Sequence, residues 1–198
     1  MRYRLAYAML LLLLLTACGG EAGFTPKPRA FPKVVYPEKA YQPFDKDYCA
    51  FTFEYPVYAE IQRDTSFFDE LPPHPCWFDI YIPNFDSRLH CSYVPINEKK
   101  DFEQLKADAF EMTDWHNKRA NYIDEVLIQK PNGVGGMAFI VEGDVASPFQ
   151  FFLTDSTEHF MRGSLYFNTE ARSDSLAPVY EFIEEDLQHL IETFEWTE

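Results

Sequence analysis

The sequence predicts an α+β domain, in which a largely antiparallel sheet of about seven strands is covered by two helices. Apolar residues alternate with polar ones over several short segments, which is the period of a half-buried strand. Two longer segments instead carry apolar residues at helical spacing. Aromatic residues, which strands favour, make up 17% of the chain. Because short turns separate neighbouring strand segments, we expect hairpins and therefore mostly antiparallel pairing.

Three strands are expected before the first helix. Cys49–Tyr55 alternates cleanly, and Pro56 ends or bends this strand, with Tyr58–Ile61 as its extension beyond the bend. Cys76–Ile82 and Arg88–Val94 follow and are joined by a short turn, so they form the first predicted hairpin.

The first helix is predicted over Asp101–Arg119, where apolar residues recur at helical spacing. Asp101 is its expected N-cap, and Gln104 completes a pattern like a capping box. A hairpin of Asn121–Gln129 and Val134–Val141 should follow, because Asn132-Gly133 between them is a strong turn signal. The last helix is predicted from about Leu176 to Phe194, with Pro178 in its first turn.

The domain is expected to be arranged around a second hairpin within Ser147–Thr169. Asp155 begins a polar turn between its two strands. One face of the hairpin should enter the core: Phe149, Phe151, Leu153, Met161, Gly163, Leu165 and Phe167.

The opposite face of this hairpin mixes aromatic residues with arginine, a composition that interfaces enrich. Its candidate docking residues are Phe152, Phe160, Arg162 and Tyr166, which lie among Gln150, Thr154 and Ser164. Two readings stay open. Either another part of the chain covers this face, such as the tether described below, with Arg162 paired to Asp155 or Glu158, or an external partner binds there.

The order of three strands, helix, four strands and helix resembles the Mog1/PsbP-like α/β sandwich. The exit of the first strand at Phe53–Pro56 adds to this resemblance. A resemblance of fold implies no function. The formal net charge of -15 argues against nucleic acid as a partner, because that interaction needs a basic surface.

The amino terminus resembles a bacterial lipoprotein signal. Arg2 and Arg4 precede the apolar Leu5–Leu15, which is too short to cross a membrane comfortably, and Leu15–Cys18 has the form of a lipobox. Residues 1–17 are then the signal peptide, and Cys18 is the lipidated residue, carrying palmitate-like acyl chains that anchor the protein stably. The expected location is the outer membrane, facing the periplasm. An ordinary secretory signal with a chance cysteine is the alternative.

Residues 18–44 are expected to form a proline-rich tether, and residues 45–198 a single folded domain. Five of the chain's 14 prolines lie in this tether, so helix is excluded there. The tether also carries seven apolar or aromatic residues, which a plain spacer would not need. It is therefore either a flexible spacer or a strap in which Arg29–Phe44 docks along the domain.

Three cysteines follow Cys18 and allow one disulfide outside the cytoplasm. If the faces of the first hairpin align, Cys91 lies opposite Ile80, and Cys76 is on the order of 13 Å away. That separation is too large for a bridge. Cys49–Cys76 is therefore the predicted disulfide, and Cys91 a buried free thiol.

No catalytic residue, metal site or cofactor is expected. The residues His74, Cys76, His90 and Cys91 match no standard zinc spacing. Asp155, Ser156 and His159 lie within one turn, too close together for a catalytic relay. Two further features are read as structural: His116 is a core histidine, and the glycine-rich Asn132–Gly136 joins two strands, so it is no phosphate loop.

Four segments resemble the gliding motility lipoprotein GldD family of Bacteroidetes: Pro26–Tyr41, Cys49–Pro56, Glu142–Gly163 and Asp174–Trp196. The resemblance implies a lipid-anchored, non-enzymatic component or assembly factor of the gliding motility and type IX secretion apparatus. Its implied partners are the membrane, through the lipid, and other envelope proteins of that apparatus. A small-ligand-binding envelope module and an envelope enzyme are the alternatives.

Overall fold

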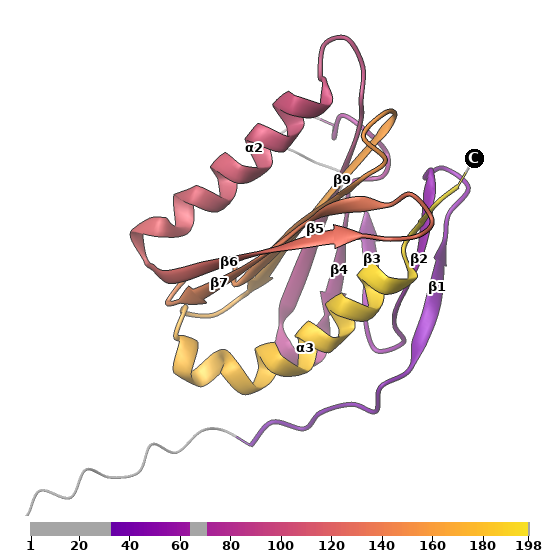
Figure 1. Cartoon of the computed structure of the whole chain (residues 1–198). Helices are drawn as coiled ribbons and strands as arrows, with labels where there is room; N and C mark the ends of the chain where they lie inside the picture. The colour runs from indigo at the N-terminus through magenta and orange to yellow at the C-terminus, as the bar shows by residue number, and fades with distance from the viewer. Residues whose placement is uncertain (1–32, 64–70, 198) are drawn as a thin grey trace, which may run out of the picture. The chain divides into compact units, whose positions relative to one another are not determined.

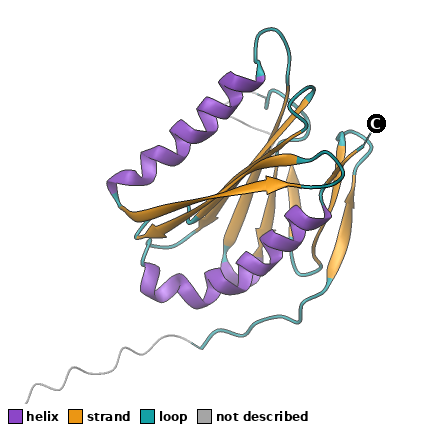
Figure 2. Ribbon diagram, in the orientation of Figure 1, coloured by secondary structure: helices purple, strands orange, loops and turns teal. Residues whose placement is uncertain are grey.

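The computed structural model describes residues 33–63 and 71–197. Two helices, α2 (Phe102–Asp114) and α3 (Ser173–Thr193), lie on opposite faces of a seven-stranded antiparallel sheet (Figures 1 and 2). The strand order of this main sheet is β3-β4-β5-β9-β8-β7-β6. The predicted fold class is therefore confirmed. The strands are β3 Glu60–Arg63, β4 Phe78–Ile82, β5 Ser87–Pro95, β6 Ala120–Gln129, β7 Gly135–Gly143, β8 Phe149–Thr154 and β9 His159–Phe167.

A second, three-stranded sheet holds both ends of the folded chain. In it β2 (Phe51–Pro56) lies between β1 (Tyr41–Asp45) and β10 (Glu195–Trp196), and both pairings are antiparallel. The first predicted strand is therefore correct as a strand, but it belongs to this small sheet. The seventh strand of the main sheet is β3. A tight turn after Pro56, closed by a bond from the Ala59 N–H to the Pro56 carbonyl, passes the chain from one sheet to the other.

The larger core lies between the main sheet, α3 and the small sheet. Stacked phenyl rings join the two sheets, with Phe44 lying 4.6 Å from Phe53 and 4.8 Å from Phe78 between ring centroids. The core face predicted for the β8–β9 hairpin enters this cluster through Phe149, Phe151, Leu153, Met161 and Leu165. Gly163 is required here, because a Cβ would lie 2.3 Å from the ring of Phe151 on the neighbouring strand.

The segment before β2 packs on the domain. Part of the predicted tether, Tyr41–Phe44, lies in β1, so the expected boundary at residue 44 falls inside a strand. Upstream of it, the Tyr36 ring lies 4.9 Å from the ring of Phe182 on α3. The docked-strap reading therefore describes residues 36–44. The signal peptide 1–17, the lipidation site Cys18 and the rest of the tether to residue 32 lie outside the described residues.

Both helices differ from prediction at their ends. Asp101 caps α2 as expected and accepts a 2.8 Å hydrogen bond from the Gln104 N–H, but the helix ends at Asp114 and continues as the 3₁₀ turn η2 (Trp115–Lys118). α3 begins three residues early at Ser173, whose N–H and hydroxyl both donate to the Asp144 carboxylate. Pro178 is therefore the sixth residue of the helix, beyond its first turn. A 3₁₀ turn, η1 (Pro83–Phe85), links β4 to β5.

Candidate functional site

Helix α2 covers most of the hairpin face that the sequence singles out for docking. Phe152 and Phe160 are buried at 4% and 3% exposure, and they pack against Leu105 and Ala109 of α2. These two phenylalanines are therefore core residues, and the proposal that they contact an external partner is wrong. The cover comes from within the chain, as one of the two readings held, but from α2 rather than from the tether.

Arg162 and Tyr166 lie on the same face but beyond the edge of α2. They line a groove of about 630 Å³ between that helix and strands β4, β5 and β9. The helix side of the groove includes Met112, and the sheet side includes Trp77 and His90. Of the aromatic residues on this face, Trp77, Tyr81 and Tyr166 are half-buried, whereas Phe152 is under α2.

Arg162 is the central cation of this groove. Its guanidinium donates to Gln150 Oε1 at 2.6 Å and approaches Met112 Sδ at 2.5 Å. Burial lowers its pKa. Within residues 33–63 and 71–197, no carboxylate lies within 4.0 Å of it, so the pairing with Asp155 or Glu158 that went with the intramolecular reading is absent. The Asp155 carboxylate instead accepts three backbone N–H groups of its own turn.

The carboxylate nearest the sheet side of the groove is already neutralised. Asp79 lies 2.5 Å from His90 Nδ1 and 3.4 Å from Arg88 Nη1. Arg88 also donates to Gln62 and stacks over the ring of Tyr81 at 4.2 Å. The sheet side of the groove therefore presents charges that are already paired, together with aromatic rings.

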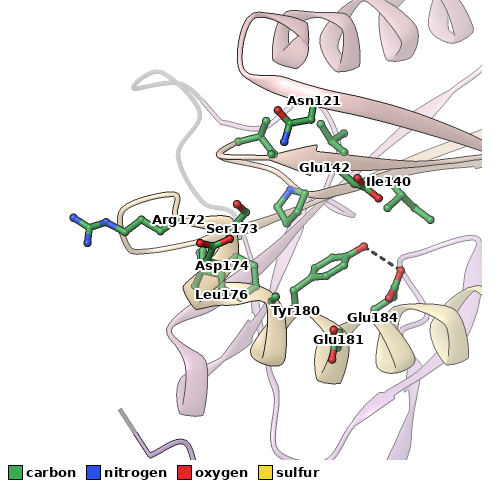
Figure 3. A pocket seen from close by; sticks show the side chains of 16 residues that line it. Asn121, Ile140, Glu142, Arg172, Ser173, Asp174, Leu176, Tyr180, Glu181 and Glu184 are labelled. Atoms are coloured by element: carbon green, nitrogen blue, oxygen red, sulfur yellow. Dashed lines mark hydrogen bonds between the residues drawn. The ribbon is translucent and has the colours of Figure 1, made fainter. Parts of the chain in front are cut away.

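A second pocket of about 530 Å³ lies between β7 and the first turns of α3 (Figure 3). The Tyr180 hydroxyl donates to Glu184 at 3.1 Å, and burial, then the charge of Glu184, raise the pKa of Tyr180. Glu142 and Glu181 line the same pocket, whereas Arg172 points away from it and pairs with Glu170. Acidic side chains thus dominate this pocket.

The residues considered for metal binding are engaged otherwise. Cys76 forms a disulfide with Cys49, at a Cα–Cα distance of 5.7 Å, which is the pairing expected from the strand register. Cys91 is a buried free thiol, and burial followed by the Asp79 charge raises its pKa. In the described part of the chain, no three His, Cys, Asp or Glu side chains are grouped as a metal site would need.

The other polar groups considered have structural surroundings. His159 Nδ1 lies 2.7 Å from the Tyr93 hydroxyl, and Ser156 sits in the turn with a φ of 66°. His116 is half-buried after α2, and burial, then the Arg162 charge, lower its pKa. Gly133 closes the turn between β6 and β7 with a φ of 83°, as expected for Asn-Gly.

Sequence reasoning missed a buried carboxylate that pins the strap to α3. Asp186 is 3% exposed and accepts hydrogen bonds from Lys39 Nζ at 2.7 Å, from the Tyr41 hydroxyl at 3.0 Å and from the Tyr58 hydroxyl. We call these four side chains the Asp186 latch. A signal was present, because Asp186 falls between Ile183 and Leu187 within the apolar stripe of the helix.

The latch makes stability fall at alkaline pH. Burial, then the hydrogen bond to Asp186, raise the pKa of both Tyr41 and Tyr58 above the ordinary value of 10.0. Above about pH 10 the unfolded chain therefore releases protons that the folded chain keeps, and the free energy of unfolding decreases as pH rises. Below that pH the stabilisation is fully present. Urea unfolding from about pH 8 to about pH 11 measures the slope, which should be shallower in Tyr58→Phe. Equal slopes in the two proteins would contradict the assignment.

Comparison with known proteins identifies the family. The sequence profile described as "Gliding motility lipoprotein GldD" matches residues 21–196. No curated protein matches the chain in sequence. Among solved structures, the chain is similar to cyanobacterial PsbP (CyanoP) from Synechocystis sp. PCC 6803, at 10% identity and a TM-score of 0.45, over 81% of this chain and 94% of that one. It is also similar to the Ran-binding protein Mog1p of Saccharomyces cerevisiae, at 12% identity and a TM-score of 0.47, over 81% and 97%.

The protein is a lipid-anchored envelope protein of the class associated with gliding motility. The chain belongs to the gliding motility lipoprotein GldD family, because the matched region covers nearly all of it. Membrane association and partners within the envelope follow from this membership. Among the described residues, no helix has both the length and the apolar content to cross a membrane.

Proposed function

We propose that this protein is a non-enzymatic component or assembly factor of the gliding motility and type IX secretion apparatus, held at the outer membrane and facing the periplasm. Family membership supports the proposal, and one structural observation carries it. That observation is the outer edge of β6, which offers both backbone groups and apolar side chains to another protein.

The backbone of β6 has a regular unpaired side. In an antiparallel ladder each residue directs its N–H and its carbonyl to the same neighbour. The Lys130 N–H donates to the Val134 carbonyl at 2.8 Å, and the register is regular from Tyr122 onward. Ile123, Glu125 and Leu127 therefore direct their backbone groups away from β7. No other strand of the described residues pairs with that side.

The side chains of this region are unusually apolar for an exposed edge. Leu127 is 70% exposed, Tyr122 is 60% exposed, and Trp115 in the preceding turn is 74% exposed. The opposite edge of the sheet, β3, has only four residues and carries Glu60 and Arg63 at its ends, which is how an edge is usually protected. The β6 edge is ten residues long and carries charge only at Asp124 and Glu125, so its length and its exposed apolar side chains fit strand addition by a partner.

Complementation of an in-frame deletion strain tests the proposal. Tyr122→Lys with Leu127→Lys should keep the melting temperature and should lose surface spreading and protein export, because charge blocks strand addition at an edge. Val57→Lys with Leu71→Lys is the matched control, since it also replaces two exposed apolar residues. Full spreading and export by the β6 variant would refute the docking role.

Lipidation is the second requirement of the proposal. Cys18→Ala should release the protein from the membrane fraction, because the acyl chains supply the anchor. Cell fractionation followed by immunodetection measures this, with Cys91→Ala as the control thiol. A Cys18→Ala protein that sediments with membranes and supports spreading would show that the anchor assignment is wrong.

A small-ligand-binding role is the second candidate. The observation that favours it is the groove beside α2, since about 630 Å³ falls within the size range of small-molecule sites.

A further inference from the structure

We propose that the groove beside α2 binds a carboxylate attached to an apolar or aromatic group, with Arg162 as the residue that holds the carboxylate. This site is separate from the β6 edge and does not depend on it. Arg162 lacks an acidic partner among the described residues, the acids beside it are already bonded, and aromatic and apolar side chains line the groove around it.

Arg162 has donors to spare. A guanidinium carries five N–H donors, and those of Arg162 meet only the Gln150 amide oxygen and the Met112 sulfur among the acceptors within hydrogen-bond distance in the described chain. The chain has 32 acidic residues against 17 basic ones, so a half-buried arginine without a carboxylate within 4.0 Å is conspicuous. A partly desolvated, unpaired charge is costly, and a bound carboxylate offsets that cost.

The amide beside Arg162 is also incompletely bonded. Gln150 is 1% exposed, and its Nε2 has no hydrogen-bond partner, while its Oε1 is held by Arg162. The amide oxygen of Gln150 therefore helps to orient the guanidinium of Arg162. This fixes one edge of the arginine and leaves the rest of its donors for a ligand in the groove.

The acidic side chains that line the groove do not compete for Arg162. Asp79 is bound by His90 and Arg88, and Asp108 accepts a 2.6 Å hydrogen bond from Gln104 Nε2. An incoming carboxylate therefore meets the Arg162 guanidinium, which no neighbouring acid pairs with, and Lys100 adds a second positive charge to the lining of the groove.

The walls select an apolar body carrying a single negative charge. Trp77, Met112 and Tyr166 line the groove beside Arg162. The volume of the groove suits a peptide end of a few residues or a small organic acid. A net charge of -15 repels polyanions over long range, which disfavours clustered phosphates. A planar carboxylate also matches the guanidinium fork, which a point anion does not.

Isothermal titration calorimetry on the lipidated protein in detergent tests the site with hippurate and, as its neutral isostere, hippuramide. Hippurate should bind at least about tenfold more tightly, as a charge-assisted hydrogen bond implies. Arg162→Gln should lose that preference, and Arg162→Lys should recover only part of it. Arg172→Gln, which removes an exposed arginine, should bind like the wild type. The NMR resonance of the Trp77 indole N–H should shift when hippurate is added and should not shift with hippuramide.

Further ligands separate the sources of the carboxylate. Acetyl-Ala-Leu-Phe carries the carboxylate at the chain end, and acetyl-Ala-Glu-Phe-amide carries it on a side chain. The peptide that binds more tightly shows which kind of carboxylate the groove prefers. Equal binding of hippurate and hippuramide, tighter binding of inorganic phosphate, or no binding of any carboxylate up to millimolar concentration would overturn the proposal. If Arg162→Gln does not fold, the comparison of acid and amide on the wild type still decides. None of these outcomes bears on the β6 edge.

Discussion

Leu187→Asp is expected to lower the free energy of unfolding by more than about 4 kcal/mol, a large part of the roughly 5–15 kcal/mol that a domain of this kind has. Leu187 is 4% exposed and lies in the same core cluster as Ile80, Leu89 and Leu165 of the main sheet. The substitution removes a large apolar side chain and puts a carboxylate in its place. Both the lost packing and the buried charge destabilise the fold.

Urea unfolding followed by circular dichroism measures the effect of Leu187→Asp. Gln188→Asp is the control, because it places the same charge one residue further along on the exposed side of α3. An unchanged unfolding midpoint for Leu187→Asp would show that this face of the helix is not packed on the sheet.

Asp186→Ala is expected to cost about 3 kcal/mol, since removing one partner of a buried, hydrogen-bonded charge leaves the others unsatisfied. Lys39 and the hydroxyls of Tyr41 and Tyr58 all lose their shared acceptor. The effect should be local as well as global. Amide hydrogen exchange in β1 should rise, because the latch holds the strap that leads into that strand.

Glu185→Ala is the matched control for Asp186→Ala. Its carboxylate lies 3.6 Å from the same Lys39 amine but is 71% exposed, so its loss should change stability by less than about 1 kcal/mol. If the two variants have equal stability and equal exchange in β1, the Asp186 latch does not stabilise the strap.

Local patterns predicted the parts of the fold that depend on neighbours in sequence. The alternation in β8 and β9 shows which side chains enter the larger core, and the Asn132-Gly133 turn places β6 beside β7. The disulfide partner of Cys76 was predicted because the hairpin register excludes Cys91 and an exported chain can form one bridge among its three remaining cysteines. Each of these needed only short-range periodicity or one hairpin register.

Long-range pairing lay beyond such patterns. Alternation shows that Phe152 and Phe160 face away from the larger core, but it does not say whether α2, the tether or a partner covers them. β1 was hidden because Pro43 and its proline-rich surroundings resemble a linker, yet proline is tolerated on an edge strand. The partner strand of β2 on its other side, β10, is 139 residues or more further along the chain.

Arg162 illustrates how a site can be half predicted. The mixture of arginine with aromatic residues indicated which face of the β8–β9 hairpin carries the groove. The position of α2 then decides which residues stay accessible: Tyr166 is half-buried on the groove, whereas Phe160 is buried at its floor with 3% exposure. Composition identified the face, and only packing divided it into core and groove.

The arrangement of β1 has a mechanical consequence. The lipid anchor precedes the strap, so tension between the membrane and the domain reaches the fold through the strap, where Lys39 and Tyr41 bind Asp186, and passes into β1. The Asp186 latch and the β1–β2 ladder therefore bear the load before it reaches the seven-stranded sheet. β10 braces β2 from its other side, so the strand that receives the pull is backed by the last strand of the chain. A pull applied from the amino-terminal side should therefore strain this small sheet before it strains the seven-stranded sheet.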